Sequence, residues 1–416
     1  MKTEPLLPIS DRTRLRELAK SIVDLVAKND YTELIQTWTA HNRGEIIRPI
    51  VVVEEHTFAD DLLNSLGQCS DPRARDIERV LLMKHWNLQC VKDDKIIEAN
   101  FEINLDLTFE LFGAPLVREH GNDDNGRQIG FRQHHTINEL PRDLESLAPS
   151  RWMQDIEKTK SRRQFVDEQI GDLMPTHIRN ESLRWCCPTG LIVGLMGMEL
   201  MFVAWMEYPE LMQQMFKRMT DDLLSFYAYQ ENEGLLQLNN GNHYAGAGSY
   251  GFSDELPASG FTGKARLCDL WFNINSQETV GVSPAMYHEM VFPHFQRLCQ
   301  PFGLTYYGCC EPVHDIWATS VSKYAHLRKV SISPWCDENT MGDNLRGGKV
   351  IYSRKPSPNY IGVGSFDAKA FAEHIEKTMI AARGCPLEFI FRDIYSLNGD
   401  LDKVGQAVNI VRQLSK

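Results

Sequence analysis

The sequence predicts a (β/α)8 TIM barrel, an α/β fold in which parallel strands alternate with helices. Short apolar or β-branched runs alternate with longer helical stretches along most of the chain, as in parallel strands joined by helical crossovers. The expected strands number about eight, which favours a closed barrel over an open sheet. No GxGxxG motif follows a strand, so nothing supports a dinucleotide-binding sheet.

The first part of the chain is predicted to begin with helices, which the first strands follow. Residues 11–43 predict helices, and RPIVVVEE at 48–55 predicts a buried strand because it is short, apolar and β-branched. Residues 72–90 predict a further helix. The run FEINLDLTFELFG at 101–113 predicts a strand followed by a loop. Residues 117–135 are polar and rich in Gly, Asn and Asp, which predicts a long loop or a hairpin insertion.

The alternation then becomes regular. We expect one helical stretch interrupted by a proline and four further helices. One of these begins with Ser283 as its N-cap and Pro284 in its first turn, and it ends at Gly303. The predicted strands lie at 183–193, 264–274, 304–309, 328–334, 348–356 and 387–394. The predicted helices lie at 198–234, 283–303, 313–327, 366–383 and 401–414.

Composition predicts one globular domain over residues 1–416, with residues 1–45 as an N-terminal helical extension. Hydrophobic residues make up 43% and charged residues 24%, which is ordinary globular usage, and no linker or repeat marks a second domain. The net charge of -12 disfavours nucleic acid as a partner, because phosphate backbones would be repelled. No run of about 18 uncharged apolar residues predicts a membrane span.

The expected location is the cytoplasm. The first residues, MKTEPLLPISDRTRLREL, show neither an apolar signal region nor an Arg-rich transit pattern. Ten cysteines without a signal peptide suggest reduced thiols. The adjacent pairs Cys186–Cys187 and Cys309–Cys310 are poorly placed for ordinary structural disulfides.

The segment YYGCCEPVHD at 306–315 follows a predicted strand and concentrates reactive groups. Barrel active sites lie at the carboxyl ends of strands, so this position is typical of a functional loop. Thiolate, carboxylate and imidazole are all zinc ligands, and a first helical turn can bring Cys310, Glu311 and His314 to one face. A structural interpretation stays open. In it Cys309 packs in the core, and the Glu311 carboxylate lies at the start of a helix, where it interacts favourably with the helix dipole.

Two further strand ends offer candidate groups. Glu278, between a strand and a helix N-cap, can ligate metal or act in proton transfer, or it can cap the loop. Cys336, at the strand end after the Cys-rich segment, can complete a thiolate site, although a small buried residue is the commoner fate of cysteine.

The late strand ends carry charged side chains. Arg354 and Lys355 follow one strand, and Arg392 and Asp393 follow the next. These groups can hold a carboxylated or phosphorylated substrate, since guanidinium groups bind both anions well. An equally weighted alternative is that Arg392 and Asp393 form a structural ion pair.

Residues 239–263 are rich in Gly and Ser and too long for a tight turn, which suggests a lid over the barrel mouth. His243 and Tyr244 lie in this segment. His243 is a candidate substrate contact, with an ordinary loop histidine as the alternative. The pair His134–His135 is interpreted as structural.

Three segments resemble the uroporphyrinogen-decarboxylase superfamily in order and spacing. They are INELPRDLESL at 137–147, the text from CPTGLIVGLMGMEL to NEG at 187–234, and VGVSPAMYHEMVFPHFQRL at 280–298. The resemblance is diffuse and spans about residues 45 to 415. True uroporphyrinogen decarboxylases carry an arginine motif after the first strand, where this chain has RPIVVVEEHTF. The arginines that would receive the propionates are therefore missing here.

Within that superfamily the chain is most similar to corrinoid-dependent methyltransferases. The branch that acts on coenzyme M has His-x-Cys where this chain has Gly308-Cys309-Cys310, so its thiol-activating zinc site is not reproduced. GCCEPVH at 308–314 looks closer to the substrate-side methyltransferases of O-demethylase systems. The resemblance implies methyl transfer from a small molecule, an aryl methyl ether, to the cob(I)alamin of a partner corrinoid protein. No DxHxxG segment for binding cobalamin is present in this chain.

For such a reaction the sequence assigns roles as expectations. A Lewis-acidic zinc or a general acid would assist departure of the ether oxygen. Metal binding or proton donation falls to Glu278, Cys310, Glu311 and His314, with Cys336 as a further ligand. The substrate contacts are expected from His243, Tyr244, Trp271, Tyr306, Arg354, Arg392 and Asp393.

Two other functions stay open at this point. One is a metal-independent lyase of the decarboxylase type acting on another small acid. The other is a non-catalytic barrel that carries a corrinoid or tetrapyrrole, which would leave the Cys-Glu-His cluster idle. A homodimer is possible by analogy with relatives in the superfamily.

Overall fold

The computed structural model describes residues 6–122, 128–183 and 185–416. Residues 1–5 of the predicted N-terminal extension, residues 123–127 of the predicted loop, and residue 184 of a predicted strand lie outside the described residues. Within the described part the chain is an α/β fold built on a parallel sheet, as the alternation of strands and helices predicts.

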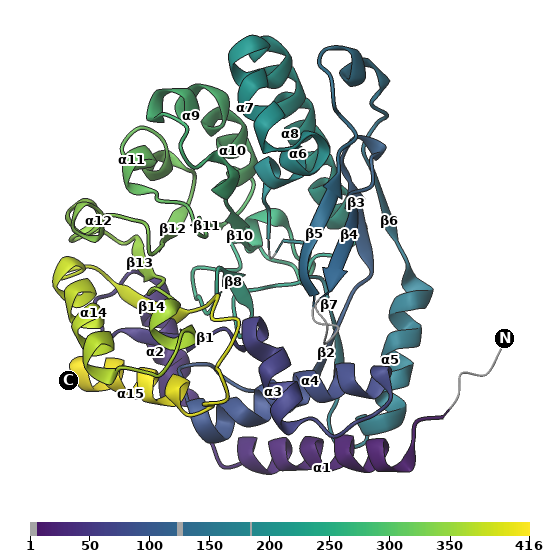
Figure 1. Cartoon of the computed structure of the whole chain (residues 1–416), viewed down its shortest axis with the longest axis vertical. Helices are drawn as coiled ribbons and strands as arrows, with labels where there is room; N and C mark the ends of the chain where they lie inside the picture. The colour runs from purple at the N-terminus through teal and green to yellow at the C-terminus, as the bar shows by residue number, and fades with distance from the viewer. Residues whose placement is uncertain (1–5, 123–127, 184) are drawn as a thin grey trace.

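The central sheet has six parallel strands in the order β1-β14-β13-β12-β11-β10, and helices lie along its outer side (Figure 1). Each strand is short and nearly every residue in it is buried, which is typical of parallel strands covered on both faces. The strands are β1 (Ile50–Val53), β10 (Trp271–Ile274), β11 (Leu304–Tyr307), β12 (Leu327–Ile332), β13 (Ile351–Arg354) and β14 (Leu387–Phe391).

The two ends of this sheet show how the chain is ordered around it. The first strand pairs with the last, with Val53 opposite Phe391. At the other end β10 makes a single parallel bridge, from Ile274 to Cys186. A separate parallel pair joins β2 (Phe101–Asn104) to β7 (Thr176–Arg179). The described strands thus pair with their neighbours in the chain from β10 to β14 and then return to β1.

The described helices include several that the sequence did not predict. Those before the hairpin are α1 (Ile9–Val26), α2 (Thr32–Asn42), α3 (Ala59–Leu66) and α4 (Pro72–Trp86), and α5 (Ile156–Ile170) follows it. The middle of the chain forms α6 (Pro188–Met196), α7 (Met198–Glu207), α8 (Pro209–Asn232), α9 (Pro284–Met290) and α10 (Phe292–Cys299). The last are α11 (His314–Trp317), α12 (Glu338–Leu345), α13 (Asn359–Gly362), α14 (Ala368–Ala381) and α15 (Lys403–Leu414).

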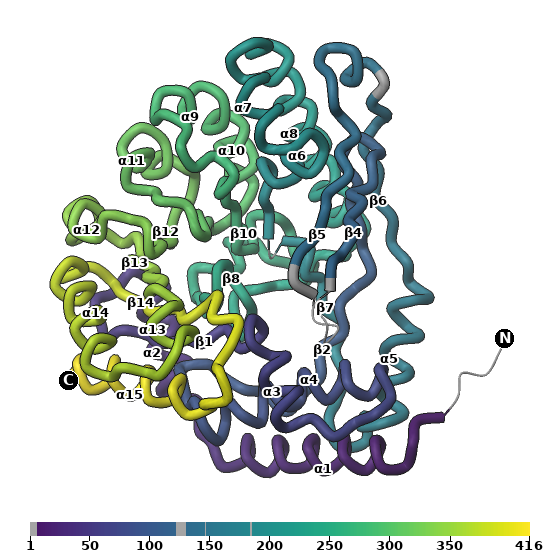
Figure 2. The backbone as a smooth tube through the Cα atoms, viewed as in Figure 1, coloured from purple at the N-terminus to yellow at the C-terminus, as the bar shows by residue number. Residues whose placement is uncertain are grey.

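The polar insertion is a hairpin, one of the two forms predicted for residues 117–135. Its strands, β4 (Val117–Asn122) and β5 (Gln128–His134), pair antiparallel and stand beside α6, α7 and α8 (Figures 1 and 2). Shorter antiparallel pairs join β3 (Leu107–Glu110) to β6 (Arg151–Gln154) and β8 (Tyr244–Gly246) to β9 (Ser249–Tyr250).

The strand predicted at 183–193 is wrong. Of its described residues, Cys186 alone makes a strand-like bridge, and α6 begins at Pro188. A proline in the first turn suits a helix start, and a short apolar run alone does not distinguish a strand from a buried helix. The single helix predicted at 283–303 is two helices, because Pro293 cannot donate the backbone hydrogen bond that would continue α9.

The largest core cluster lies between the central sheet and the helices α6 to α15. A second cluster joins α1, α4 and α5 to β2. Among the described helices none is by itself long and apolar enough to span a membrane; α6 and α7 pass that test only together, and they are bent by 98°.

Candidate active site

Polar side chains gather where the strands of the central sheet end. Glu54 follows β1, Ser276 lies two residues beyond β10, Lys355 follows β13 and Arg392 follows β14. Cys309 is the second residue after β11. Because the carboxyl ends of parallel strands meet at one edge, these groups share one side of the sheet, where α/β enzymes carry their chemistry.

Arg392 and Glu54 join the last strand to the first. Arg392 Nε lies 3.1 Å from Glu54 Oε2, and both side chains are buried. Tyr244 donates a hydrogen bond to the other oxygen of Glu54 at 3.0 Å. Burial opposes the guanidinium charge, yet Glu54 and its neighbours keep the pKa of Arg392 above the usual value. Among the described residues Arg392 Nη1 has no hydrogen-bond partner, so one donor stays free at this edge.

Cys309 and Cys310 place two sulfur atoms beside this pair. Their Sγ atoms are 3.3 Å apart, and Cys310 Sγ lies 3.8 Å from Asp393 Oδ2. The hydrogen bond with Cys310, together with burial, raises the pKa of Cys309. The same hydrogen bond lowers the pKa of Cys310. Asp393 has a φ of 58°, which turns its carboxylate back to within 3.2 Å of Arg392 Nε.

Glu311 is 3% exposed and ties two strand ends together. Its two carboxylate oxygens accept the backbone N–H groups of Ser276 at 3.0 Å and Cys309 at 2.9 Å. Burial raises its pKa in spite of these bonds. Both oxygens are thus occupied by main-chain donors, an arrangement that fixes the loop after β11 relative to the loop after β10.

The predicted zinc ligands of the strand-end segments do not converge on one point. Glu311 faces backbone amides, and His314 Nδ1 accepts the N–H of Asp337 at 3.3 Å. Cys336 Sγ accepts the N–H of Val313 at 3.3 Å. Among the described residues no three His, Cys, Asp or Glu side chains are grouped as zinc requires. The predicted ligand set therefore does not fit a zinc ion in this arrangement.

Glu278 lies in a 3-10 turn (Gln277–Thr279) at the start of the loop before α9. Its Oε2 accepts hydrogen bonds from Thr189 at 2.7 Å and from the Cys187 thiol at 3.1 Å. Burial raises the pKa of Cys187 well above its usual value, so the thiol keeps its proton and remains a donor. A side chain at Gly190 would meet Glu278 Oε1 at 3.1 Å, so this glycine leaves room beside that oxygen.

A cavity of about 560 Å³ opens between the β4–β5 hairpin, α6, α8 and the Glu278 turn. Gly194 lets Leu116, just before the hairpin, approach α6, since a Cβ on Gly194 would come within 2.7 Å of Leu116. Glu278 is the carboxylate among the described residues that line the cavity, and Arg118 is the guanidinium. The aromatic side chains of the wall are those of Phe109, Phe131, Trp185, Phe226 and Tyr227.

Several predicted substrate contacts lie elsewhere. Trp271 is fully buried and its indole donates to the carbonyl of Gly251 at 2.8 Å. Arg354 is held on the helix side by Glu338 at 2.5 Å and the carbonyl of Ser333 at 2.6 Å. His243 lines a separate cavity of about 30 Å³. These three do not border the large cavity, and their roles in binding stay predictions.

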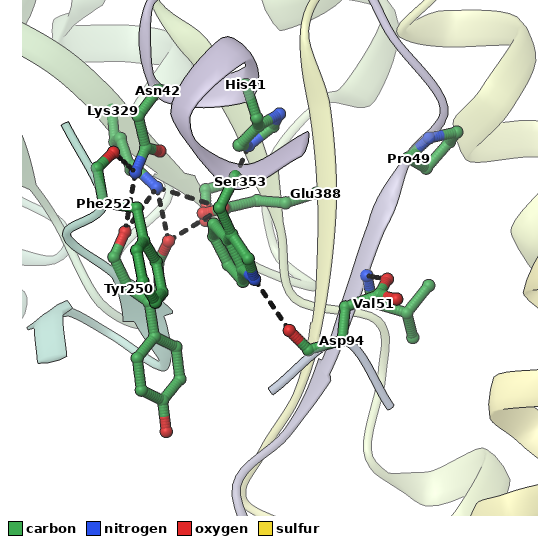
Figure 3. Close-up of polar contacts among 12 residues, drawn as sticks. His41, Asn42, Pro49, Val51, Asp94, Tyr250, Phe252, Lys329, Ser353 and Glu388 are labelled. Carbon is green, nitrogen blue, oxygen red and sulfur yellow. Dashed lines mark hydrogen bonds and ion pairs between the residues drawn. The ribbon is translucent and has the colours of Figure 1, made fainter. Parts of the chain in front are cut away.

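Tyr306 and Lys355 belong to a buried polar network in the sheet interior. Lys355 Nζ donates to the Tyr306 hydroxyl and to Ser353 Oγ, and Ser353 donates to Glu388. Burial lowers the pKa of Lys355 to about 7. Figure 3 shows the part of the network in which Glu388 contacts His41 and Lys329. Ser249 also donates a hydrogen bond to Glu388, at 2.7 Å.

The sequence reasoning missed the contacts of Cys187 and Thr189 with Glu278. Both residues belong to CPTGL, which carries the family resemblance, but no spacing rule links this segment to Glu278, 89 residues beyond Thr189. It also missed a hydroxyl cluster in which Tyr287 contacts Tyr307 at 2.7 Å and Tyr324 at 2.8 Å. The three tyrosines lie in separate elements, and nothing in their spacing in the sequence shows that their hydroxyl groups meet.

Comparisons with known proteins find similarity to a solved structure. No protein-family model matches the chain, and no curated protein sequence matches it. Among solved structures, a methyltransferase from Methanosarcina mazei is similar to this chain, with a TM-score of 0.53 and 11% sequence identity. The similarity covers 92% of this chain and 99% of that one. At this identity the likeness establishes a shared fold.

Proposed function

We propose that the central sheet belongs to a (β/α)8 barrel of the uroporphyrinogen-decarboxylase kind. The pairing of β1 with β14 supports this, because a barrel requires its first and last strands to meet. Two positions remain, and they would fall to β2 and to the stretch from β7, which pairs with β2, to the Cys186 bridge with β10.

We further propose that the chain is a methyltransferase acting on a methylated small molecule, an aryl methyl ether, with a corrinoid protein as its partner. The observation that carries this proposal is the aromatic cavity with Glu278 in its wall. Aromatic side chains suit a planar ring, and a carboxyl group suits proton donation to a poor leaving group. The shared fold with the Methanosarcina mazei methyltransferase supports the same reaction class.

In this mechanism the chain supplies binding and proton transfer. Cob(I)alamin, carried by the partner, supplies the nucleophile that takes the methyl group. Phe226 and Tyr227 on α8 pack against the ring of the donor. Glu278 gives a proton to the ether oxygen as it leaves, so the product departs as a neutral phenol. Thr189 and Cys187 hold Oε2 of Glu278, which directs Oε1 toward the space beside Gly190.

Exposed apolar side chains lie on the loops at the carboxyl ends of the strands, where a partner would approach. Val280 follows β10, Trp335 follows β12, Tyr395 follows β14, and Trp185 precedes the Cys186 bridge. Their exposed fractions run from 38% for Trp185 to 74% for Trp335. Covering such side chains is favourable on association, which supports a protein partner at this face.

Arg392 favours a second candidate, a lyase that removes carbon dioxide from a small acid. Its Nη1 is buried without a hydrogen-bond or ion-pair partner among the described residues, and a substrate carboxylate would satisfy it. This candidate needs no partner protein.

The deciding experiment is an anaerobic assay with methoxylated aromatic compounds and cob(I)alamin. The loss of the cob(I)alamin absorption measures the transfer. We expect methyl transfer that falls about 10²–10⁴-fold in Glu278→Gln, the usual contribution of a general acid. The exposed Glu207→Gln is the matched control and should keep full activity. Carbon dioxide release from small acids without cob(I)alamin, lost in Arg392→Lys, would establish the lyase instead.

A further inference from the structure

The chain has two pairs of adjacent cysteines, and their side chains behave differently. In the first pair Cys186 Sγ accepts the Tyr227 hydroxyl at 3.2 Å while Cys187 Sγ donates to Glu278. Each of these sulfur atoms is engaged with a different element. In the second pair the Cys309 and Cys310 sulfur atoms contact each other at 3.3 Å.

We propose that Cys309 and Cys310 form a dithiol site that reacts with low-molecular-weight disulfides and closes to a disulfide between the two adjacent residues. This inference goes beyond the proposed function and does not depend on it. The proposed transfer uses neither sulfur atom, so the pair has no assigned role in that chemistry.

The distance between the sulfur atoms makes closure a small movement. A disulfide bond is about 2.05 Å long, so the two Sγ atoms need to approach by a little over 1 Å. Adjacent Cα atoms are about 3.8 Å apart, below the range of about 4.4–6.8 Å of ordinary disulfides. A disulfide here would therefore be strained, and strained disulfides are readily reduced. These properties suit a reversible site rather than a structural bridge.

The surroundings distinguish the two sulfur atoms. Cys310 is partly exposed at the strand-end face, whereas Cys309 is 2% exposed. The Arg392 guanidinium lies close enough for its charge to favour a thiolate at either position. Cys310 is thus the residue that an external disulfide reaches first, and Cys309 is the resolving thiol behind it.

The reaction balances as two exchange steps. The Cys310 thiolate attacks one sulfur of glutathione disulfide, forms a mixed disulfide and releases one glutathione thiolate. Cys309 then loses its proton and attacks Cys310 Sγ, which releases the second glutathione thiolate. The protein loses two electrons and the glutathione disulfide gains them.

Formation of the disulfide would change the loop after β11. The carbonyl of Cys309 accepts a hydrogen bond from Ser331 Oγ at 2.6 Å, and its N–H holds Glu311 at 2.9 Å. A ring through adjacent residues has to turn the peptide that carries this carbonyl. The Ser331 bond would then be lost, and the position of Glu311 between the loops after β10 and β11 would change with it.

In the test, the whole protein is incubated with glutathione disulfide and its remaining thiols are alkylated. The protein is then digested, and the masses of its peptides are measured. We expect the peptide with Cys309 and Cys310 to lose two hydrogen atoms and to regain them with dithiothreitol. The peptide with Cys186 and Cys187 is the internal control and should be alkylated at both thiols. In Cys309→Ser the reaction should stop at a mixed disulfide between Cys310 and glutathione. In Cys310→Ser the remaining thiol, Cys309, should react with glutathione disulfide at least tenfold more slowly.

Two outcomes would overturn the inference. One is a stable glutathione adduct on Cys310 in the unsubstituted protein, which would show that Cys309 does not resolve it. The other is equal oxidation of both adjacent pairs. Because the readout is peptide mass, neither outcome depends on whether the chain transfers methyl groups.

Discussion

Arg392 Nε lies 3.1 Å from Glu54 Oε2, and this contact joins the residue after the last strand to the residue after the first. Both side chains are buried, so each compensates a charge that would otherwise be costly to hold in the interior. The pair fixes the edge of the sheet at which the candidate site lies.

Glu54→Gln should lower the free energy of unfolding by about 3–5 kcal/mol, because it leaves the Arg392 charge buried and less compensated. The measurement is urea denaturation followed by circular dichroism. Glu45→Gln is the control, since Glu45 pairs with Arg43 at 3.3 Å on the surface and should cost about 1 kcal/mol or less. Equal losses in the two variants would mean that the buried pair contributes no more than a surface pair.

Gly190→Ala should reduce activity without loss of helix. Alanine favours a helix by about 1 kcal/mol over glycine, but its Cβ would meet Cys187 Sγ at 2.9 Å and Glu278 Oε1 at 3.1 Å. We expect at least a tenfold fall in kcat/KM in the methyl-transfer assay, with the circular dichroism signal retained. Gly130→Ala, where a Cβ meets open space, is the control. Unchanged activity in Gly190→Ala would show that Glu278 Oε1 tolerates displacement.

Lys355 should make stability rise with pH. Burial lowers its pKa to about 7, whereas a lysine in an unfolded chain has a pKa of about 10.4. Between these values the unfolded chain binds one more proton, so the free energy of unfolding rises by up to about 1.4 kcal/mol per pH unit. Below the lower value both states are protonated and this slope disappears.

The measurement for Lys355 compares urea denaturation of the protein and of Lys355→Met at about pH 7.5 and about pH 9.5. The stability difference should shift in favour of the unsubstituted protein at the higher pH. The exposed Lys349→Met serves as the control. A pH-independent difference for Lys355→Met would mean that Lys355 stays charged in the fold throughout this range.

Glu311→Gln should destabilise the protein by about 1–3 kcal/mol, because an amide accepts with one oxygen where the carboxylate accepts two N–H groups with two. The amide nitrogen would then face a backbone donor. Thermal denaturation measures the loss. If Glu311→Gln is as stable as the parent but inactive, Glu311 acts in the reaction rather than in holding the loops.

Elemental analysis should find no stoichiometric zinc that depends on Cys310, because the predicted ligands face different partners. The comparison is between the purified protein and Cys310→Ser. Near-stoichiometric zinc that disappears in Cys310→Ser would show that these side chains rearrange to bind metal.

The sequence reasoning predicted the strands of the central sheet well because they are short, apolar and β-branched. It failed at 183–193, where an apolar run after Cys187 forms a helix started by Pro188. It also could not place Arg354 and Lys355. Adjacent strand-end residues point to opposite faces, and nothing in the residue types shows which one turns inward.

The candidate site was predicted in part for a similar reason. The positions of Glu278 and Cys310 after strands were predicted because strand ends can be read directly from the sequence, and their roles stay predictions. The cavity wall was not found, because it depends on how the β4–β5 hairpin packs against α6. That contact relies on Gly194 making room for Leu116, a long-range fit that no local pattern reveals.

The pairing of β1 with β14 also constrains the order in which the chain can fold. Ile50–Val53 is a wholly apolar strand whose hydrogen-bonding partner, Leu387–Phe391, is synthesised more than 300 residues later. Until then the edge of β1 that will meet β14 has no strand to pair with, and unpaired apolar edges invite aggregation. Slow synthesis would lengthen that exposure, so the yield of folded protein should depend on what shields β1 during translation.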